Sequence, residues 1–523
     1  YCGRDNERSI TYSMFSKAFS AAIHGIDGMI VSVEADVSDG LPIFDMVGYL
    51  GSEVKEARER VKIALKNSGF KIPAKRITVN LSPADIRKEG TAFDLPVAIA
   101  ILGAFGHLCS ESLKDILIIG ELSLNGKINK VNGVLPIVYC AMQQGFKKCI
   151  IPKENEREGA VVEGIATYGV STLTEAVEFL NNKETIKATC VSRGEMLHRL
   201  NHTETLDFSD VSGQMATKRA IEIAVAGMHN VLMIGPPGSG KTMLAKRIPS
   251  IMPELSFDES MDISKIYSIA GLMGGQGLIL QRPFRSPHHT ITTTALVGGG
   301  RTPRPGEVSL ADQGVLFLDE LPEFQKNTIE VLRQPLEERV VTISRLNGTY
   351  RYPANFMLIA AMNPCNCGYY PDRNKCSCST NQVKRYLGKI SKPLLDRFDI
   401  CVEAIQINYK ELAVTQKEES SEEIRRRVSL ARDMQLNRYK EQNIYFNSQL
   451  NPRGIKNYCK LHKKDQALME EAFAKMNLSA RAYHRILKVA RTIADLDESL
   501  HIKSMHISEA ICYRSLEQKY WID

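Results

Sequence analysis

The chain of 523 residues is long enough for about three domains, and its contents of 43% hydrophobic and 24% charged residues are ordinary for a globular protein. An uncharged stretch in the N-terminal part, residues 95–108, spans about 14 residues and is too short to cross a bilayer, so we expect a cytoplasmic protein without a membrane partner. The formal net charge of +7 is mild, which restricts any nucleic-acid site to a local patch.

The N-terminal part alternates short strand patterns with helical ones. Residues 1–13 are polar and unpatterned, and since Met14 is a plausible start, we expect them to be an upstream extension or a fragment end. We predict strands over 29–37, 77–81, 116–119 and 149–151, and helices over 52–69 and near 95–108. This alternation predicts an α+β or α/β domain over residues 14–182, followed by a polar linker over 183–205.

A complete phosphate-binding loop follows the apolar run 231–234. The pattern G-x-x-x-x-G-K-[ST] is formed by Gly235, Pro236, Pro237, Gly238, Ser239, Gly240, Lys241 and Thr242. Backbone N–H groups of such a loop surround phosphate oxygens, Lys241 supplies a charge for the β- and γ-phosphates, and the Thr242 hydroxyl can ligate Mg²⁺. The strand and helix patterns on either side favour this interpretation over a chance glycine-rich turn.

Residues 314–320 supply the second half of the same site, because they form a buried-strand pattern that ends in Asp319 and Glu320. In open α/β sheets, ligands bind at the carboxyl ends of such strands. We expect Asp319 to hold the Mg²⁺ and Glu320 to polarise the attacking water. Alone this pattern is common, but together with the phosphate loop it indicates hydrolysis of a nucleotide triphosphate rather than binding only.

Two stretches of the predicted nucleotide domain lack acidic residues. The first lies between Asp262 and Glu307 and carries Lys265, Arg282, Arg285, Arg301 and Arg304 with His288 and His289. The second runs from 339 to 371 and includes a predicted β-hairpin, 340–352, around the turn-forming pair Asn347-Gly348. Near its tip, Arg345 and Arg351 are candidates to contact DNA phosphates and Tyr350 to stack on bases. The alternative is a solvated hairpin whose arginines meet only water or neighbouring subunits.

Four of the twelve cysteines lie in one short segment, as Cys365, Cys367, Cys376 and Cys378. Four thiolates on two short arms match the tetrahedral coordination of structural Zn²⁺. The C-x-C spacing is tighter than the commoner C-x₂-C, and free buried thiols are the alternative. We predict a closed zinc site with an architectural role.

These motifs together resemble those of a known family. Residues 286–290, 304–309, 314–324 and 394–399 match the magnesium-chelatase-related branch of the AAA+ ATPases, and with the N-terminal run 15–25 the chain from Met14 resembles the YifB/ComM family of bacterial proteins. The resemblance implies an α/β multidomain protein with a Lon-protease-like α+β domain, an AAA+ P-loop NTPase core over residues 206–403 and a C-terminal helical lid over 404–523. It also implies Mg²⁺-dependent hydrolysis of ATP.

The resemblance assigns further site residues. Asn363, after the strand pattern 356–362, corresponds to sensor 1, Arg397 to an arginine finger offered to a neighbouring subunit, and Arg481 to sensor 2 in the lid. From the residues alone, Asn363 is equally able to cap a turn before Pro364, and Arg397 to pair with Asp396 or Asp399. A finger that acts on the neighbouring subunit implies a ring of identical subunits, which we expect to be hexameric.

The N-terminal segment resembles the proteolytic domain of Lon over residues 89–96 and 120–135, yet Ala92 and Leu135 stand where that family has its Ser and Lys. We therefore expect no proteolysis. The family resemblance implies a ring motor that acts on single-stranded or branched DNA, as a helicase or in branch migration during recombination or transformation. An AAA+ remodelling ATPase with a protein client and the motor subunit of a metal chelatase are the alternatives.

Overall fold

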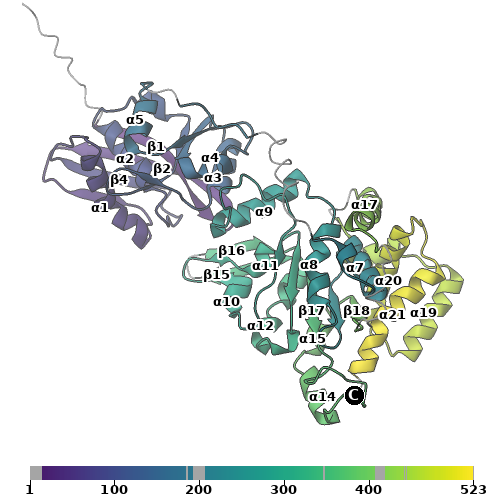
Figure 1. The fold of residues 1–523 in the computed structure, drawn as a ribbon. Coiled ribbons are helices and arrows are strands. Elements are labelled where there is room, and N and C mark those ends of the chain that lie inside the picture. Colours follow the sequence, from purple (N-terminus) through teal and green to yellow (C-terminus); the bar gives the residue numbers. More distant parts are fainter. Residues whose placement is uncertain are drawn as a thin grey trace, which may run out of the picture. The chain divides into compact units, whose positions relative to one another are not determined.

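The computed structural model describes residues 14–183, 186–191, 206–345, 348–406, 418–440, 442 and 444–521. The chain divides into two compact units (Figure 1). Unit 1 comprises residues 1–202, 260–280 and 344–351, and unit 2 comprises 203–259, 281–343 and 352–523. Two segments of the predicted ATPase domain therefore belong, by their contacts, to the N-terminal unit. The predicted extension 1–13 and most of the predicted linker 183–205 lie outside the described residues.

A seven-stranded mixed sheet in the order β3-β4-β2-β1-β5-β8-β9 forms the centre of unit 1. The predicted strands and helices occur with slightly different ends, whereas β1, which pairs antiparallel with β2, is an additional strand whose small Ala and Ser side chains give a weak apolar signal. The elements are β1 (Phe15–His24), β2 (Asp27–Ser38), β3 (Phe44–Val47), α1 (Ser52–Asn67), β4 (Arg76–Ser82), α2 (Asp94–Ala104), β5 (Ile116–Ile118), β6 (Glu121–Leu122), β7 (Ile128–Asn129), α3 (Val134–Gln143), β8 (Lys148–Pro152), α4 (Glu156–Gly159), β9 (Ala166–Val170) and α5 (Leu173–Leu180).

Helices cover both faces of this sheet, because successive strand residues point to opposite sides. Ile118 and Ile150 pack with α1, α2 and α5 in one apolar core, while Leu117 and Ile151 pack with α3 in a second core. Helix α2 is buried at every position, which explains why its sequence is apolar all round. Unit 1 thus contains a sheet between two helical layers, in agreement with the α+β or α/β domain that the sequence predicts.

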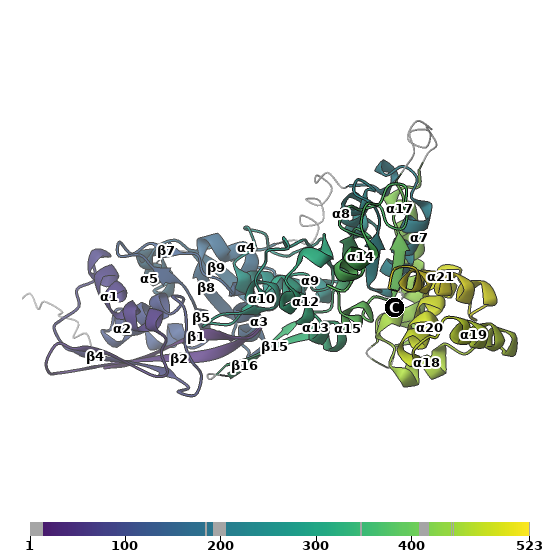
Figure 2. The same cartoon turned by 90° about the horizontal axis from the view of Figure 1, so that it is seen from below.

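Five parallel strands in the order β11-β14-β17-β10-β18 form the sheet of unit 2, and their carboxyl ends share one edge. Figure 1 shows α7 and α8 beside strands β17 and β18 of this sheet, and Figure 2 shows the same two helices from below. The elements up to the last strand are α7 (Met215–Gly227), β10 (Val231–Ile234), α8 (Lys241–Ile251), α9 (Phe257–Ala270), β11 (Phe284–Arg285), α10 (Thr293–Val297), β12 (Gly298–Gly299), β13 (Arg304–Pro305), α11 (Glu307–Leu310), β14 (Val315–Leu318), α12 (Lys326–Glu330), α13 (Arg333–Glu338), β15 (Val340–Arg345), β16 (Gly348–Pro353), β17 (Met357–Met362), α14 (Thr380–Leu387), α15 (Lys392–Leu395) and β18 (Ile400–Glu403).

After β18 the described chain is helical, as predicted. Its helices are α17 (Ser421–Arg438), α18 (Pro452–Tyr458), α19 (Lys463–Lys475), α20 (Ala480–Leu496) and α21 (Ser504–Tyr520). The apolar residues of α20 lie on one face and share one core with α7 and the sheet. The predicted hairpin also forms, as β15 and β16, although Asn347 lies outside the described residues.

Candidate active site

The phosphate loop connects the carboxyl end of the central strand β10 with the first turn of α8. Gly240 caps α8 with φ +77°, a left-handed conformation that glycine adopts without strain and that turns the loop into the helix. The ammonium of Lys241 donates to the carbonyls of Gly235 at 2.8 Å and Pro236 at 2.9 Å. Burial lowers the pKa of Lys241, and the charge of Asp319 opposes that shift. The lysine is therefore held inside the loop, where the sequence motif requires it.

Thr242 and Asp319 meet at this edge although they are far apart in sequence. The threonine hydroxyl donates to the Asp319 carboxylate at 2.6 Å. They meet because β10 and β14 flank β17 and all three strands run parallel, so the residues that follow them gather at one edge. Oxygens of this kind are the ligands that Mg²⁺ prefers, and the pair therefore fits a magnesium ion bound next to the nucleotide phosphates.

Asn363 and Glu320 complete the predicted catalytic set. The Asn363 side-chain oxygen, directly after β17, accepts from Lys241 at 3.3 Å. Glu320 directly follows Asp319, has φ +52°, and is 61% exposed, so its carboxylate is accessible to solvent. His289 lies beside it, with 3.7 Å between its Nδ1 and a Glu320 oxygen. His289 follows β11 at the same edge of the sheet, and in the sequence we treat it only as part of a basic stretch.

Arg397 lies at the opposite edge of the sheet. It precedes β18, and since Val231 pairs with Ile400 in parallel register, it sits at the amino ends of the strands. Four strand residues at about 3.3 Å each separate it by roughly 13 Å from the edge with the phosphate loop. Its guanidinium pairs with Glu337, and neither Asp396 nor Asp399, the alternatives drawn from the sequence, is that partner.

Arg481 is exposed in the first turn of α20. One turn later, Arg485 donates to the Phe398 carbonyl at 3.4 Å and lies 3.6 Å from Asp399. The start of α20 therefore lies close to the amino end of β18, on the same side of the sheet as Arg397. Both arginines assigned from the family resemblance thus share the edge away from their own phosphate loop.

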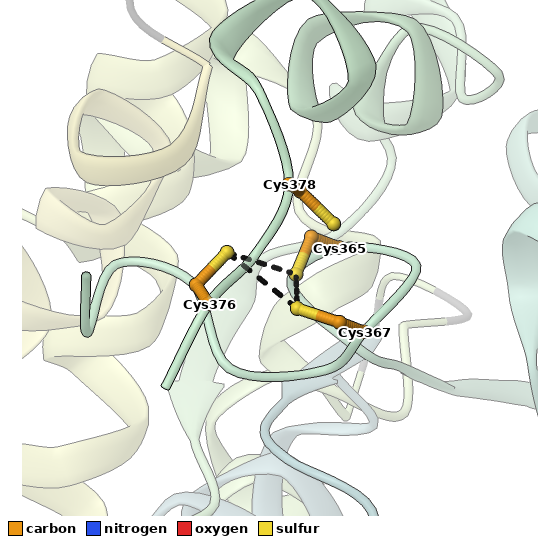
Figure 3. Close-up of side chains that lie close together, drawn as sticks. All are labelled: Cys365, Cys367, Cys376 and Cys378. Carbon is orange, nitrogen blue, oxygen red and sulfur yellow. Dashed lines mark hydrogen bonds between the residues drawn. The ribbon is translucent and has the colours of Figure 1, made fainter. Parts of the chain in front are cut away.

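The four clustered cysteines converge as predicted (Figure 3). Their sulfur atoms all lie within 4.8 Å of one another, and Cys365 Sγ is 3.3 Å from that of Cys367 and 3.8 Å from that of Cys376. Four thiolates around a tetrahedral Zn²⁺ at about 2.3 Å lie about 3.8 Å apart. The Tyr370 N–H also donates to Cys365 Sγ at 3.4 Å, and such a bond would orient this sulfur toward a metal ion. The donor set therefore fits a structural zinc ion.

The cysteine-bearing loop touches the phosphate loop directly. A Cβ atom on Gly368 would lie 2.5 Å from Cδ of Pro237, so the Gly368 backbone lies against the Pro237 ring at a distance that only glycine permits. The cysteine-bearing loop is therefore placed to support the phosphate loop.

The first acid-free stretch is partly neutralised by acidic residues that lie outside it in the sequence. Arg282 is 6% exposed and lies 3.3 Å from the Glu259 carboxylate, which precedes the stretch. Arg285 makes two hydrogen bonds with Glu307, which follows it, at 2.6 and 2.7 Å. Acids outside the stretch therefore neutralise two of its arginines. In the hairpin, by contrast, Arg345 and Arg351 are exposed.

Known proteins are similar to this chain over nearly its full length. Family models match in succession, with "Subunit ChlI of Mg-chelatase" over residues 33–155, "Magnesium chelatase, subunit ChlI" over 207–412 and "Magnesium chelatase, subunit ChlI C-terminal" over 418–514. Competence protein ComM of Haemophilus influenzae is 44% identical over 499 residues, which cover 95% of this chain and 97% of that protein. The uncharacterized protein YifB of Escherichia coli is 42% identical over 498 residues, with 94% and 96% covered. An archaeal Lon protease of Thermococcus kodakarensis is 28% identical over 167 residues, 30% of this chain and 26% of that protein.

Proposed function

The chain belongs to the ComM/YifB family of magnesium-chelatase-related AAA+ proteins, and from this premise we propose that it is an ATP-hydrolysing ring motor that acts on DNA. The observation that carries the ATPase part is the contact of Thr242 with Asp319 at 2.6 Å, with Lys241 and Glu320 at the same edge. This edge holds every group that phosphoryl transfer to water requires from one subunit.

The residues divide the work of hydrolysis. The loop N–H groups and Lys241 bind the phosphates, and Thr242 and Asp319 would hold the Mg²⁺ that neutralises their charge. Glu320 accepts a proton from the attacking water, since its carboxylate is exposed at the edge that carries the phosphate loop. Asn363 orients that water beside the γ-phosphate through the same side chain that contacts Lys241.

The charge that develops on the γ-phosphate is met from a neighbouring subunit. Arg397 cannot serve its own nucleotide, because it lies at the amino edge of the sheet and the phosphate loop at the carboxyl edge. Arg397 is 9% exposed and paired with Glu337, so its use in trans requires that this ion pair opens on assembly. Arg481, near the same edge, would act across the same boundary. Such an arrangement needs a closed ring, which we propose to be a hexamer.

A structural Zn²⁺ held by Cys365, Cys367, Cys376 and Cys378 is part of the proposal. The metal would fix the loop that follows Asn363 and touches Pro237 of the phosphate loop. Its contribution is architectural, because four cysteines leave no open coordination position for water or substrate.

DNA is the proposed polymer because the relative with 44% identity is named a competence protein and because the hairpin presents exposed arginines. Arg345 and Arg351 are proposed to contact phosphates and Tyr350 to stack on a base, with single-stranded or branched DNA as the substrate class. Branch migration or unwinding during recombination or transformation is the corresponding activity, and we propose that it takes place in the cytoplasm.

The test is the rate of ATP hydrolysis with branched DNA, with duplex DNA and without DNA. We expect stimulation that is largest with branched DNA. Replacement of Arg345 and Arg351 by Ala should abolish the stimulation, leave the basal rate unchanged and flatten the salt dependence of binding by about two phosphate contacts. If the wild-type protein neither binds DNA nor responds to it, the proposal fails in favour of a protein client.

A further inference from the structure

The tip of the β15–β16 hairpin is seated on the N-terminal domain within unit 1. The ring of Tyr350 packs on His24, the last residue of β1, with centroids 4.7 Å apart and planes inclined by 34°. A Cβ atom on Gly348 would lie 3.5 Å from Cε1 of the same imidazole. The start of β16 therefore lies against the end of β1, at both Gly348 and Tyr350.

The turn that follows β1 is shaped for this contact. Gly25 has φ +67°, and a Cβ atom there would lie 3.4 Å from the carbonyl oxygen of Arg351. Burial raises the pKa of the Tyr350 phenol, the charge of Glu89 raises it further, and the charge of Arg87 lowers it. His24 and Gly25 therefore both lie against β16.

A second segment of the ATPase domain, residues 260–280, packs on the same N-terminal domain. Ser268 of α9 donates its hydroxyl to the buried carboxylate of Glu158 at 2.5 Å, and Glu158 accepts the N–H of Leu135 at 3.0 Å. The Ser268 carbonyl accepts the N–H of Gly133 at 3.0 Å. Leu135 stands where the Lon resemblance would have the lysine. This second segment thus docks beside the position where the Lon resemblance would have the lysine.

We propose that the N-terminal domain holds the DNA-contacting hairpin in place and that His24 is the positioning residue that orients Tyr350. The domain then has a role without any hydrolytic chemistry, because it orients the aromatic side chain on which a base would stack. Arg345 and Arg351, exposed beside it, remain the phosphate contacts. The DNA part of this inference rests on the proposed function, whereas the seating of the hairpin does not.

The experiment compares three single variants of the full chain for binding to single-stranded DNA over a range of salt concentrations. An aromatic pair of this kind contributes an affinity change of about 2- to 10-fold, so His24→Ala should weaken binding by that factor. The salt dependence should stay that of the wild type, because no phosphate contact is lost. His24→Phe should restore the affinity, because any aromatic ring at position 24 can pack on Tyr350 and the imidazole nitrogens are not required. His107→Ala is the matched control, since His107 packs on Phe70 in the same domain, with centroids 5.8 Å apart, and should bind DNA as the wild type does.

Each result that differs from these expectations would contradict the positioning role of His24. Unchanged affinity in His24→Ala would overturn the positioning role, and tighter binding would show instead that the N-terminal domain masks Tyr350. A smaller salt dependence would also overturn the positioning role, because it would mean that His24 contacts phosphate itself.

Hydrogen exchange of the backbone amides of residues 348–351, measured without DNA, tests the contact of the hairpin with the N-terminal domain independently of DNA binding. Since a two-stranded hairpin is marginal by itself, we expect exchange about 2- to 10-fold faster in His24→Ala than in His107→Ala. Faster exchange in a protein that binds no DNA would support the contact of the hairpin with the N-terminal domain and reject the DNA motor. Equal exchange in the two variants would refute the proposal that the N-terminal domain holds the hairpin in place.

Discussion

Substitution of Gly368 tests whether the cysteine-bearing loop supports the phosphate loop. A Cβ atom at this position would lie 2.5 Å from Cδ of Pro237, whereas ordinary contact begins at 3.4 Å. Gly368→Ala must therefore separate the two loops by about 0.9 Å. If zinc holds the cysteine loop, the phosphate loop is the softer of the two and moves away.

The magnitude follows from what that shift removes. A charge-assisted hydrogen bond to a phosphate contributes about 1.5–3 kcal/mol, so the loss of one such bond weakens nucleotide binding by about 10- to 150-fold. The substitution also forces alanine to φ +86°, which costs stability by roughly 1–2 kcal/mol in addition. This second effect acts on unfolding of the domain and not on the geometry of the site.

A matched control separates the two effects. Gly145 has φ +87° with no atom within 4 Å of the position of a Cβ atom, so Gly145→Ala carries the backbone strain without the contact. Equilibrium binding of a fluorescent ATP analogue, zinc content and thermal unfolding should be measured for both variants. We expect both to lose stability, both to keep their zinc, and only Gly368→Ala to bind nucleotide weakly. Equal nucleotide affinity in the two variants would refute the reasoning.

Glu320→Gln should bind ATP as the wild type does but hydrolyse it at least about 100-fold more slowly, because the metal ligands remain while the proton acceptor is lost. A wild-type turnover number in this variant would exclude that role for Glu320. Purified protein should contain one zinc ion per chain by metal analysis and lose it in the double variant Cys376→Ser, Cys378→Ser. A metal-free wild type, prepared without chelator, would exclude the site. Arg397→Ala and Lys241→Ala subunits should each be nearly inactive alone and recover hydrolysis when mixed, since some interfaces then join an intact phosphate loop to an intact arginine. Co-assembled rings without recovery would rule out the finger.

Motifs whose parts lie close together in the sequence are predictable from it. The phosphate loop needs only the run from Gly235 to Thr242 between a strand and a helix, and the structure places it there. The cysteine cluster is similar, because short arms of C-x-C leave the four sulfur atoms little room to separate. The contact of Thr242 with Asp319 spans 77 residues, yet it too is predictable, since parallel strands bring their carboxyl ends to one edge.

Contacts between distant surface side chains are not predictable in this way. The absence of acids around Arg282 and Arg285 suggests free positive charge, but Glu259 and Glu307, just outside the stretch, fold back onto both. Sequence spacing likewise offers Asp396 or Asp399 as the partner of Arg397, whereas the structure supplies Glu337. Neutralisation of a charge depends on which loops come into contact in the folded chain, and the local sequence pattern does not predict these contacts.

The sequence by itself therefore determined the predicted nucleotide site and the expectation of an N-terminal domain that resembles Lon without its Ser and Lys. Only the tertiary structure decided which surface of that domain meets the hairpin, because the packing of Tyr350 on His24 joins residues 326 positions apart. The same holds for the close approach of Gly368 to Pro237. Hydrophobic patterns specify which residues of an element are buried, but the packing of one element on another follows from shape and is fixed only when the chain is folded.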